Sequence, residues 1–231
     1  MKKLKVLGGG AVHGLVEALR PAFEAATGFA IDGTFGAVGA MRARLLAGEP
    51  ADLVILSRAL IDGLARDGHL AANSVADLGA VETAVAVRQG EALPSVDDAD
   101  ALRAALLAAD EIHFPDPEQA TAGIHFAKVM RDLGIWNEVA SRLKTAPNGA
   151  TAMRALAAST SAHPIGCTQA TEILSTPGIV LVASLPPDCA LATVYTAAIG
   201  TKSEAHKEAA GLIAMLTDDA GREARRRLGF S

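Results

Sequence analysis

The sequence is poor in aromatic residues and lacks any long uninterrupted apolar run. Aromatic side chains make up 3% of the 231 residues, whereas 50% of the residues are hydrophobic. The core must therefore be built from small aliphatic side chains, which suits helices packed closely on a parallel sheet. No stretch is long enough to cross a bilayer, so we expect no membrane span.

Cysteine and the common catalytic motifs are also scarce. Cys167 and Cys189 are the two cysteines, and no C-x-x-C pair is present, which argues against a zinc knuckle or a thioredoxin-like motif. Their spacing is compatible with a disulfide and with two free thiols. The motifs of zinc hydrolases, nucleophile elbows and P-loops are missing as well. The sequence therefore predicts no metal site and no cofactor.

The formal net charge of −5 argues against nucleic acid as a partner. The arginines at 222–227 lie in the last predicted helix, whose C-terminus favours cations. The first residues resemble the start of a signal peptide, but His13, Glu17 and Arg20 interrupt the apolar region that should follow. We expect a periplasmic protein if a signal has been removed, and otherwise a cytoplasmic one.

The first third of the chain alternates short apolar segments with helical periods. Strands are predicted at 5–8, 29–35 and 52–56, and helices at 12–27, 39–47 and 59–67. Glycines follow the three helices as C-terminal caps, at 28, 48 and 68. This order favours a parallel sheet with right-handed crossovers.

A second α/β segment begins after the alternating residues 81–88. Helices are predicted at 98–108, 121–133, 135–143, 150–158 and 169–174, and strands at 111–114, 164–167 and 179–183. A return strand at 192–199 and helices at 204–216 and 219–228 complete the chain. We therefore predict an α/β protein of two lobes, 1–82 plus 196–231 and 83–195, each a mostly parallel sheet flanked by helices. The hinge strands lie near 82–88 and 192–199.

Candidate ligand-binding residues lie where predicted strands end and helices begin, because ligands of parallel sheets bind at such junctions. They are Gly9, Gly10, Ala11 and His13 after the first strand, Ala37, Val38 and Gly39 after the second, Ser57 and Arg58 after the third, and Thr121, Ala122 and Gly123 in the second lobe. Glycine lets backbone approach a ligand closely, and arginine can bind a carboxylate. Tight turns and helix caps at Ser57 and Thr121 explain the same residues equally well.

Two histidines lie near these helix starts. His13 and His125 could bind an anion or transfer a proton. A surface or packed imidazole without such a role fits the sequence as well.

Short segments spread over the whole chain resemble the molybdate-binding proteins of ABC importers. They lie at 23–28, 35–39, 48–55, 116–118, 122–123, 133–136 and 227–230. The resemblance implies the two-lobed type II periplasmic-binding-protein fold, with a ligand cleft between the lobes. It also implies a small anionic solute, an ABC permease as a partner, and a monomer.

The resemblance also indicates which anion to expect. The family binds its oxyanion through two serines, a tyrosine and backbone N–H groups. The serines fall on Ala11 and Val38, the tyrosine falls on Gln169, and the backbone donors fall near Ser57 and Thr151. Each lost charge-assisted hydrogen bond would cost about 1.5–3 kcal/mol. The resemblance therefore favours a small organic carboxylate over molybdate.

A group of proteins with this fold and similar glycine-rich starts resembles aconitate isomerase. The leading expectation is a solute-binding protein that traps its anion by hinge closure. The alternative is a cofactor-independent isomerase that shifts an allylic proton of a small tricarboxylate. Such an enzyme needs a base and donors for the developing enolate, for which His13, His125 and Ser57 are the candidates.

Overall fold

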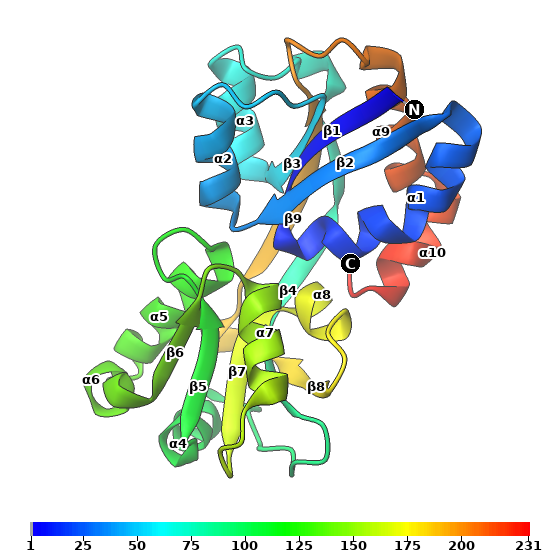
Figure 1. The fold of residues 1–231 in the computed structure, drawn as a ribbon. Helices are drawn as coiled ribbons and strands as arrows, with labels where there is room; N and C mark the ends of the chain where they lie inside the picture. The colour runs from blue at the N-terminus through cyan, green and yellow to red at the C-terminus, as the bar shows by residue number, and fades with distance from the viewer. Residues whose placement is uncertain (1) are drawn as a thin grey trace. The chain divides into compact units, whose positions relative to one another are not determined.

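The computed structural model describes residues 2–231, except for the side chain of residue 220. The chain forms two compact units (Figure 1). Unit 1 comprises residues 1–81 and 193–231, and unit 2 comprises residues 82–192.

Unit 1 is built on a sheet in the order β2-β1-β3-β9. The strands are β1 (Lys2–Gly9), β2 (Phe29–Gly36), β3 (Leu53–Ser57) and β9 (Ala192–Ile199). β1 is parallel to β2 and β3, whereas β9 is antiparallel to β3. The residues of β3 from Leu53 to Leu56 are fully buried, as predicted for a strand covered on both faces.

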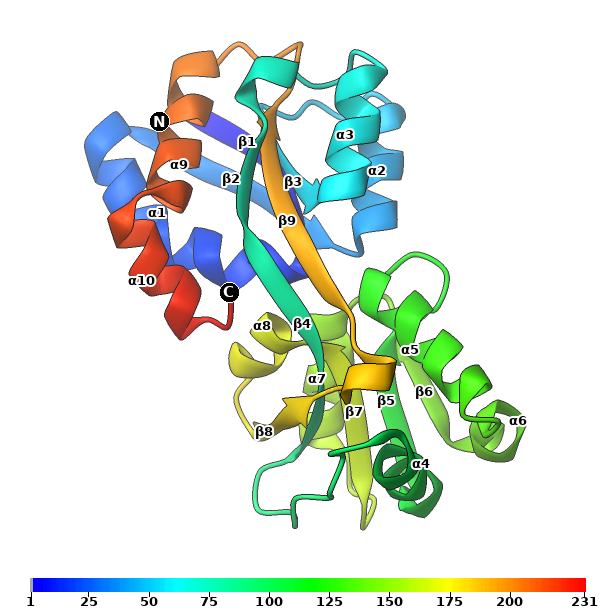
Figure 2. The same ribbon diagram turned by 180° about the vertical axis from the view of Figure 1, so that it is seen from behind.

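Helices cover both faces of this sheet (Figures 1 and 2). They are α1 (His13–Thr27), α2 (Val38–Leu46), α3 (Arg58–Arg66), α9 (His206–Thr217) and α10 (Asp219–Arg227). The helices α1, α9 and α10 pack on one face, and α2 and α3 pack on the other. Gly28 ends α1 with a φ of 71°, a left-handed conformation that favours glycine, which confirms the predicted cap.

Unit 2 has the strand order β4-β7-β5-β6, with β8 paired to the other edge of β4. The strands are β4 (Ala76–Arg88, which starts in unit 1), β5 (Glu111–Pro115), β6 (Leu143–Ala146), β7 (Pro164–Gln169) and β8 (Ile179–Ser184). β5 is parallel to both β6 and β7, and β4 is antiparallel to β7 and β8. The helices are α4 (Ala99–Ala108), α5 (Thr121–Asp132), α6 (Trp136–Val139), α7 (Gly149–Ala158) and α8 (Ala170–Leu174).

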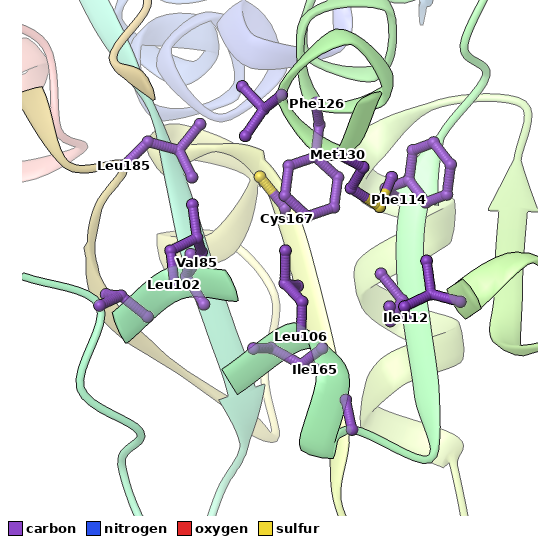
Figure 3. Close-up of a cluster of buried hydrophobic side chains, with 14 of the residues drawn as sticks. Val85, Leu102, Leu106, Ile112, Phe114, Phe126, Met130, Ile165, Cys167 and Leu185 are labelled. Carbon is purple, nitrogen blue, oxygen red and sulfur yellow. The ribbon is translucent and has the colours of Figure 1, made fainter. Parts of the chain in front are cut away.

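The core of unit 2 lies between this sheet and the helices α4 and α5. The side chains that point toward one another there include Val85, Leu102, Leu106, Phe114, Phe126, Met130, Ile165 and Cys167 (Figure 3). Phe114 and Phe126 meet edge to face with their ring centroids 5.6 Å apart. Cys167 and Cys189 are buried free thiols, so the described residues contain no disulfide between them. Burial raises the pKa of the Cys167 thiol.

One strand of unit 2 was not predicted. The helix expected over 135–143 consists of α6 and the 3₁₀ turn η3 (Ala140–Arg142), and the edge strand β6 begins at Leu143. This strand has four residues, two exposed ones between two half-buried ones, so its sequence carries no alternating strand signal. Among the described residues, every helix falls short of the length and apolarity that a bilayer span requires.

Candidate functional site

The parallel strands of unit 1 end at one edge of the sheet, and each leads directly into a helix. After β1 the chain enters the 3₁₀ turn η1 (Gly10–Val12), which continues into α1. The helix α2 follows Ala37, and α3 follows Ser57. The register pairs Gly8 with both Phe35 and Ile55, so the three junctions are neighbours on this edge. The predicted residues of the first lobe therefore lie together.

These helix starts are open, in the sense that no side chain in the described part of the chain caps their backbone N–H groups. Within residues 2–231, η1, α1, α2 and α3 have no side-chain cap and no acidic residue in the first turn. By contrast, Asp98 caps α4 and Asp218 caps α10, and both helices carry a further aspartate in the first turn. An uncapped helix start offers unpaired N–H groups and the positive end of the helix dipole, so this edge favours an anion. The cap considered for Ser57 is not formed.

The residues that replace the two family serines line this edge with apolar groups. Ala11 is 3% exposed and Val38 is 7% exposed. A Cβ atom added to Gly9 would lie 2.9 Å from Cγ1 of Val38 and 3.0 Å from Cε1 of Tyr195. Gly9 is therefore required by close packing in the folded chain. Tyr195 pairs with Ser57 across β3 and β9 and is the only tyrosine in the sequence, yet its place beside this edge was not predicted.

His13 is the first residue of α1, and its side chain is 52% exposed. Its ring stacks on Phe35 with the centroids 4.6 Å apart and the planes inclined by 27°. The Nε2 atom lies 3.7 Å from Oε1 of Glu17. Hydrogen bonds from Arg20 lower the pKa of the Glu17 carboxyl, although its partial burial acts in the opposite direction.

Arg58 is engaged by carboxylates of its own chain. Its guanidinium lies 2.9 Å from Oδ1 of Asp62 and 2.6 Å from Oδ2 of Asp77. These two partners raise the pKa of Arg58, Asp77 more strongly than Asp62. Its role toward a ligand carboxylate stays a prediction.

The parallel strands of unit 2 also end at one edge, where α5, α7 and α8 begin. Ala120 is the N-cap of α5, so Thr121 is its first helical residue and not its cap. A Cβ atom on Gly123 would lie 2.2 Å from the carbonyl oxygen of Asp116. The close approach at Gly123 is therefore to its own strand end. Ala122 is buried beside it.

The start of α7 is closed, because side chains of the protein accept hydrogen bonds from its backbone N–H groups. Asn148 accepts a hydrogen bond of 2.9 Å from the backbone N–H of Thr151, a group that was expected to bind the ligand. The carboxyl group of Glu172 accepts from Thr168 Oγ1 at 2.6 Å and from the backbone N–H groups of Ala150 and Gln169. Burial raises the pKa of Glu172, and these hydrogen bonds reduce the shift. Glu172 was not among the predicted site residues.

The second histidine belongs to unit 2. Its Nε2 atom lies 2.7 Å from the carbonyl oxygen of Cys189, so this nitrogen of His125 has a partner within the unit. The described residues hold no group of three or more His, Cys, Asp or Glu side chains able to bind a metal ion. The catalytic roles of His125 and Ser57 stay predictions.

Comparison with known proteins identifies relatives across the whole chain. Residues 4–231 match the family model of the bacterial extracellular solute-binding proteins. The aconitate isomerase of a Pseudomonas species is 31% identical over 214 residues, which cover 90% of this chain and 79% of that protein.

Solved structures share the fold at lower identity. The periplasmic molybdate-binding protein of Azotobacter vinelandii superimposes with a TM-score of 0.80 at 19% identity, covering 99% of this chain and 98% of that one. The sulfate-binding protein of Mycobacterium tuberculosis gives a TM-score of 0.77 at 17% identity, covering 100% and 86%. The predicted type II periplasmic-binding-protein fold is thereby confirmed.

Proposed function

Because the chain belongs to the bacterial extracellular solute-binding proteins, we propose that it binds a small organic carboxylate and holds it by hinge closure. The observation that carries this proposal is the set of open helix starts. The helices η1, α2, α3 and α5 begin at strand ends without a side-chain cap or a first-turn acid within the described chain. The partial positive charges of such helix starts are suited to an anion.

The side chains at these helix starts support an organic anion over an inorganic one. Ala11 and Val38 offer methyl groups where the resemblance expects hydroxyl donors. A tetrahedral dianion needs many donors around a compact charge, whereas a carboxylic acid also presents carbon atoms to apolar neighbours. The relative with 31% identity is named for a tricarboxylate, which agrees with this preference.

Thermal unfolding in the presence of a panel of anions tests the proposal. The panel contains molybdate, tungstate, sulfate, citrate and both aconitates. A ligand present at a hundred times its Kd should stabilise the protein by about 2.7 kcal/mol. We expect this effect from a carboxylate, and the absence of stabilisation by every anion would overturn the proposal.

A double variant examines the basis of the selectivity. Ala11→Ser with Val38→Ser restores both hydroxyl donors, so molybdate binding should strengthen by at least about tenfold. Ala65→Ser in α3 is the control, because it adds a serine hydroxyl away from the strand ends. Equal molybdate affinities in the two variants would contradict the assignment of this edge.

A second candidate function is a cofactor-independent isomerase of a small tricarboxylate. Two observations favour it, namely the related aconitate isomerase and the exposed imidazole of His13 at the open edge of unit 1. Incubation of the protein with trans-aconitate, followed by proton NMR, distinguishes an enzyme from a receptor. Appearance of cis-aconitate at a rate proportional to protein concentration supports the isomerase, and an unchanged spectrum contradicts it.

We further propose that an ABC permease is the partner of the receptor form, that the protein acts in the periplasm if it is exported, and that it is a monomer. Family membership supports a small solute and a transporter context. Reconstituted transport with the permease tests the partner, cell fractionation tests the compartment, and light scattering tests the monomer.

A further inference from the structure

The imidazole of His13 rests on a platform that the surrounding sequence is built to hold. The ring of Phe35 covers two glycines of neighbouring strands, Gly8 in β1 and Gly33 in β2. A Cβ atom on Gly8 would lie 2.7 Å from Cδ1 of this ring, and one on Gly33 would lie 2.5 Å from Cε2. Any larger residue at either position would displace the ring. With both glycines the ring remains in place, and the His13 imidazole stacks on it at 4.6 Å.

A carboxylate constrains the same imidazole from within α1. Oε1 of Glu17 lies 3.7 Å from His13 Nε2, an ion-pair distance once the ring is protonated. Glu17 cannot turn away freely, because Arg20 donates to both of its oxygens, at 2.8 and 2.6 Å. Arg20 is itself anchored on the carbonyl oxygen of Ile31 in β2. The Nε2 side of the ring therefore faces a fixed negative charge, which favours the tautomer with the proton on Nε2 and leaves Nδ1 as the basic nitrogen of the neutral ring.

We infer that His13 is the catalytic residue of an allylic proton shift, with Phe35 and Glu17 as positioning residues. This inference rests on the isomerase candidate described above. The neutral imidazole takes a proton from the methylene carbon next to the double bond of the bound acid, and the electron pair of the broken C–H bond enters the allylic system. The imidazolium then returns the proton to the other end of that system, so the double bond moves and no co-reactant is consumed.

The two positioning residues, Phe35 and Glu17, act on different parts of this reaction. Phe35 fixes the plane of the ring, which determines the direction in which the nitrogen lone pair points. Glu17 stabilises the imidazolium that forms when the proton is taken. The open N–H groups at the starts of η1 and α2 lie on the same edge and can stabilise the charge that develops on the substrate carboxylate.

Kinetics and binding measured on the same variants test the inference. The substrate is trans-aconitate, turnover is followed by NMR, and Kd is measured by calorimetry. His13→Ala should lower kcat by about 100-fold or more while trans-aconitate still binds, and added imidazole should restore part of the rate. Glu17→Gln and Phe35→Leu should lower kcat by about tenfold with KM nearly unchanged, because each acts through His13. His69→Gln, an exposed histidine of the same unit, is the control and should keep the wild-type rate.

Each outcome has a distinct meaning. Retained turnover in His13→Ala, or turnover lost in that variant only because aconitate no longer binds, would overturn the catalytic role. Effects of Glu17→Gln and Phe35→Leu confined to KM would overturn the positioning roles. Binding of aconitate by the wild type without turnover would reject this inference and leave the receptor function standing. An absence of binding to any anion would reject the proposed function itself.

Discussion

The helix starts of unit 1 and unit 2 lie at equivalent places in their sheets but differ in whether side chains cap them. In unit 1 the helices η1, α2 and α3 begin without caps in the part of the chain that the structure describes. In unit 2 the start of α7 is closed by Asn148 and by the carboxyl group of Glu172. A capped start contributes to stability, whereas an open start keeps its N–H groups for a ligand. In unit 2 the helix α5 also begins without a side-chain cap from the described residues, so the contrast lies between the capped start of α7 and the uncapped starts of η1, α2, α3 and α5.

The largest expected effect concerns the closed start of α7. A Cβ atom in Gly149→Ala would lie 1.9 Å from Oε2 of Glu172 and 2.1 Å from Oγ1 of Thr168. The carboxyl group would lose its donors while remaining buried, so we expect a loss of about 3–5 kcal/mol in the free energy of unfolding. Urea denaturation measures it. Gly63→Ala in α3 is the control, since nothing lies within 4 Å of its added Cβ, and it should stabilise the protein by up to about 1 kcal/mol.

This contact shows where prediction from sequence stops. The glycines that end helices, such as Gly28, are set by local backbone conformation, and the sequence predicts them correctly. Gly149 is a glycine because a side chain from another helix enters the space beside it. No local sequence pattern indicates this contact, so neither Gly149 nor Glu172 was predicted to be important.

The second effect is a difference between the wild type and Glu172→Gln in how the free energy of unfolding depends on pH. The pKa of Glu172 in the folded protein is raised above its ordinary value of 4.5 by burial. The associated stability is therefore fully present below about pH 4.5 and is lost as the pH rises through the raised pKa. A tenfold change in the protonation equilibrium of this carboxyl between the folded and unfolded protein corresponds to about 1.4 kcal/mol. In Glu172→Gln this decline should be absent, and parallel pH profiles of wild type and variant in urea denaturation would contradict the assignment.

The smallest expected effect is the difference between removing an N-cap side chain that makes a hydrogen bond and removing one that makes none. Asn148→Ala removes the side-chain acceptor of the Thr151 N–H and should cost about 1 kcal/mol. Ser57→Ala removes a side chain that makes no cap hydrogen bond within the described residues, so stability should change by less than about 0.5 kcal/mol. Thermal unfolding of the two variants measures both. A larger loss in Ser57→Ala than in Asn148→Ala would reverse the comparison.

The sequence predicted the candidate site only in part, for a physical reason. Strand-to-helix junctions follow from periodicity, so the sequence located the helix starts that contain Ala11 and Val38. The surroundings of His13 depend on which face of β2 Phe35 occupies and on the ion pair between Glu17 and Arg20. These are tertiary contacts, and they decide whether an exposed imidazole is free or held in place.

Backbone amide NMR during a titration with trans-aconitate tests the central claim most directly, because it reports on each helix start separately. We predict saturable shifts of the amides at 10–12, 38–40 and 58–60, and none at 99–101, where Asp98 caps α4. Unchanged amides at the open starts, or shifts as large at the capped start of α4, would contradict the claim that the chain leaves these groups unpaired for an organic anion.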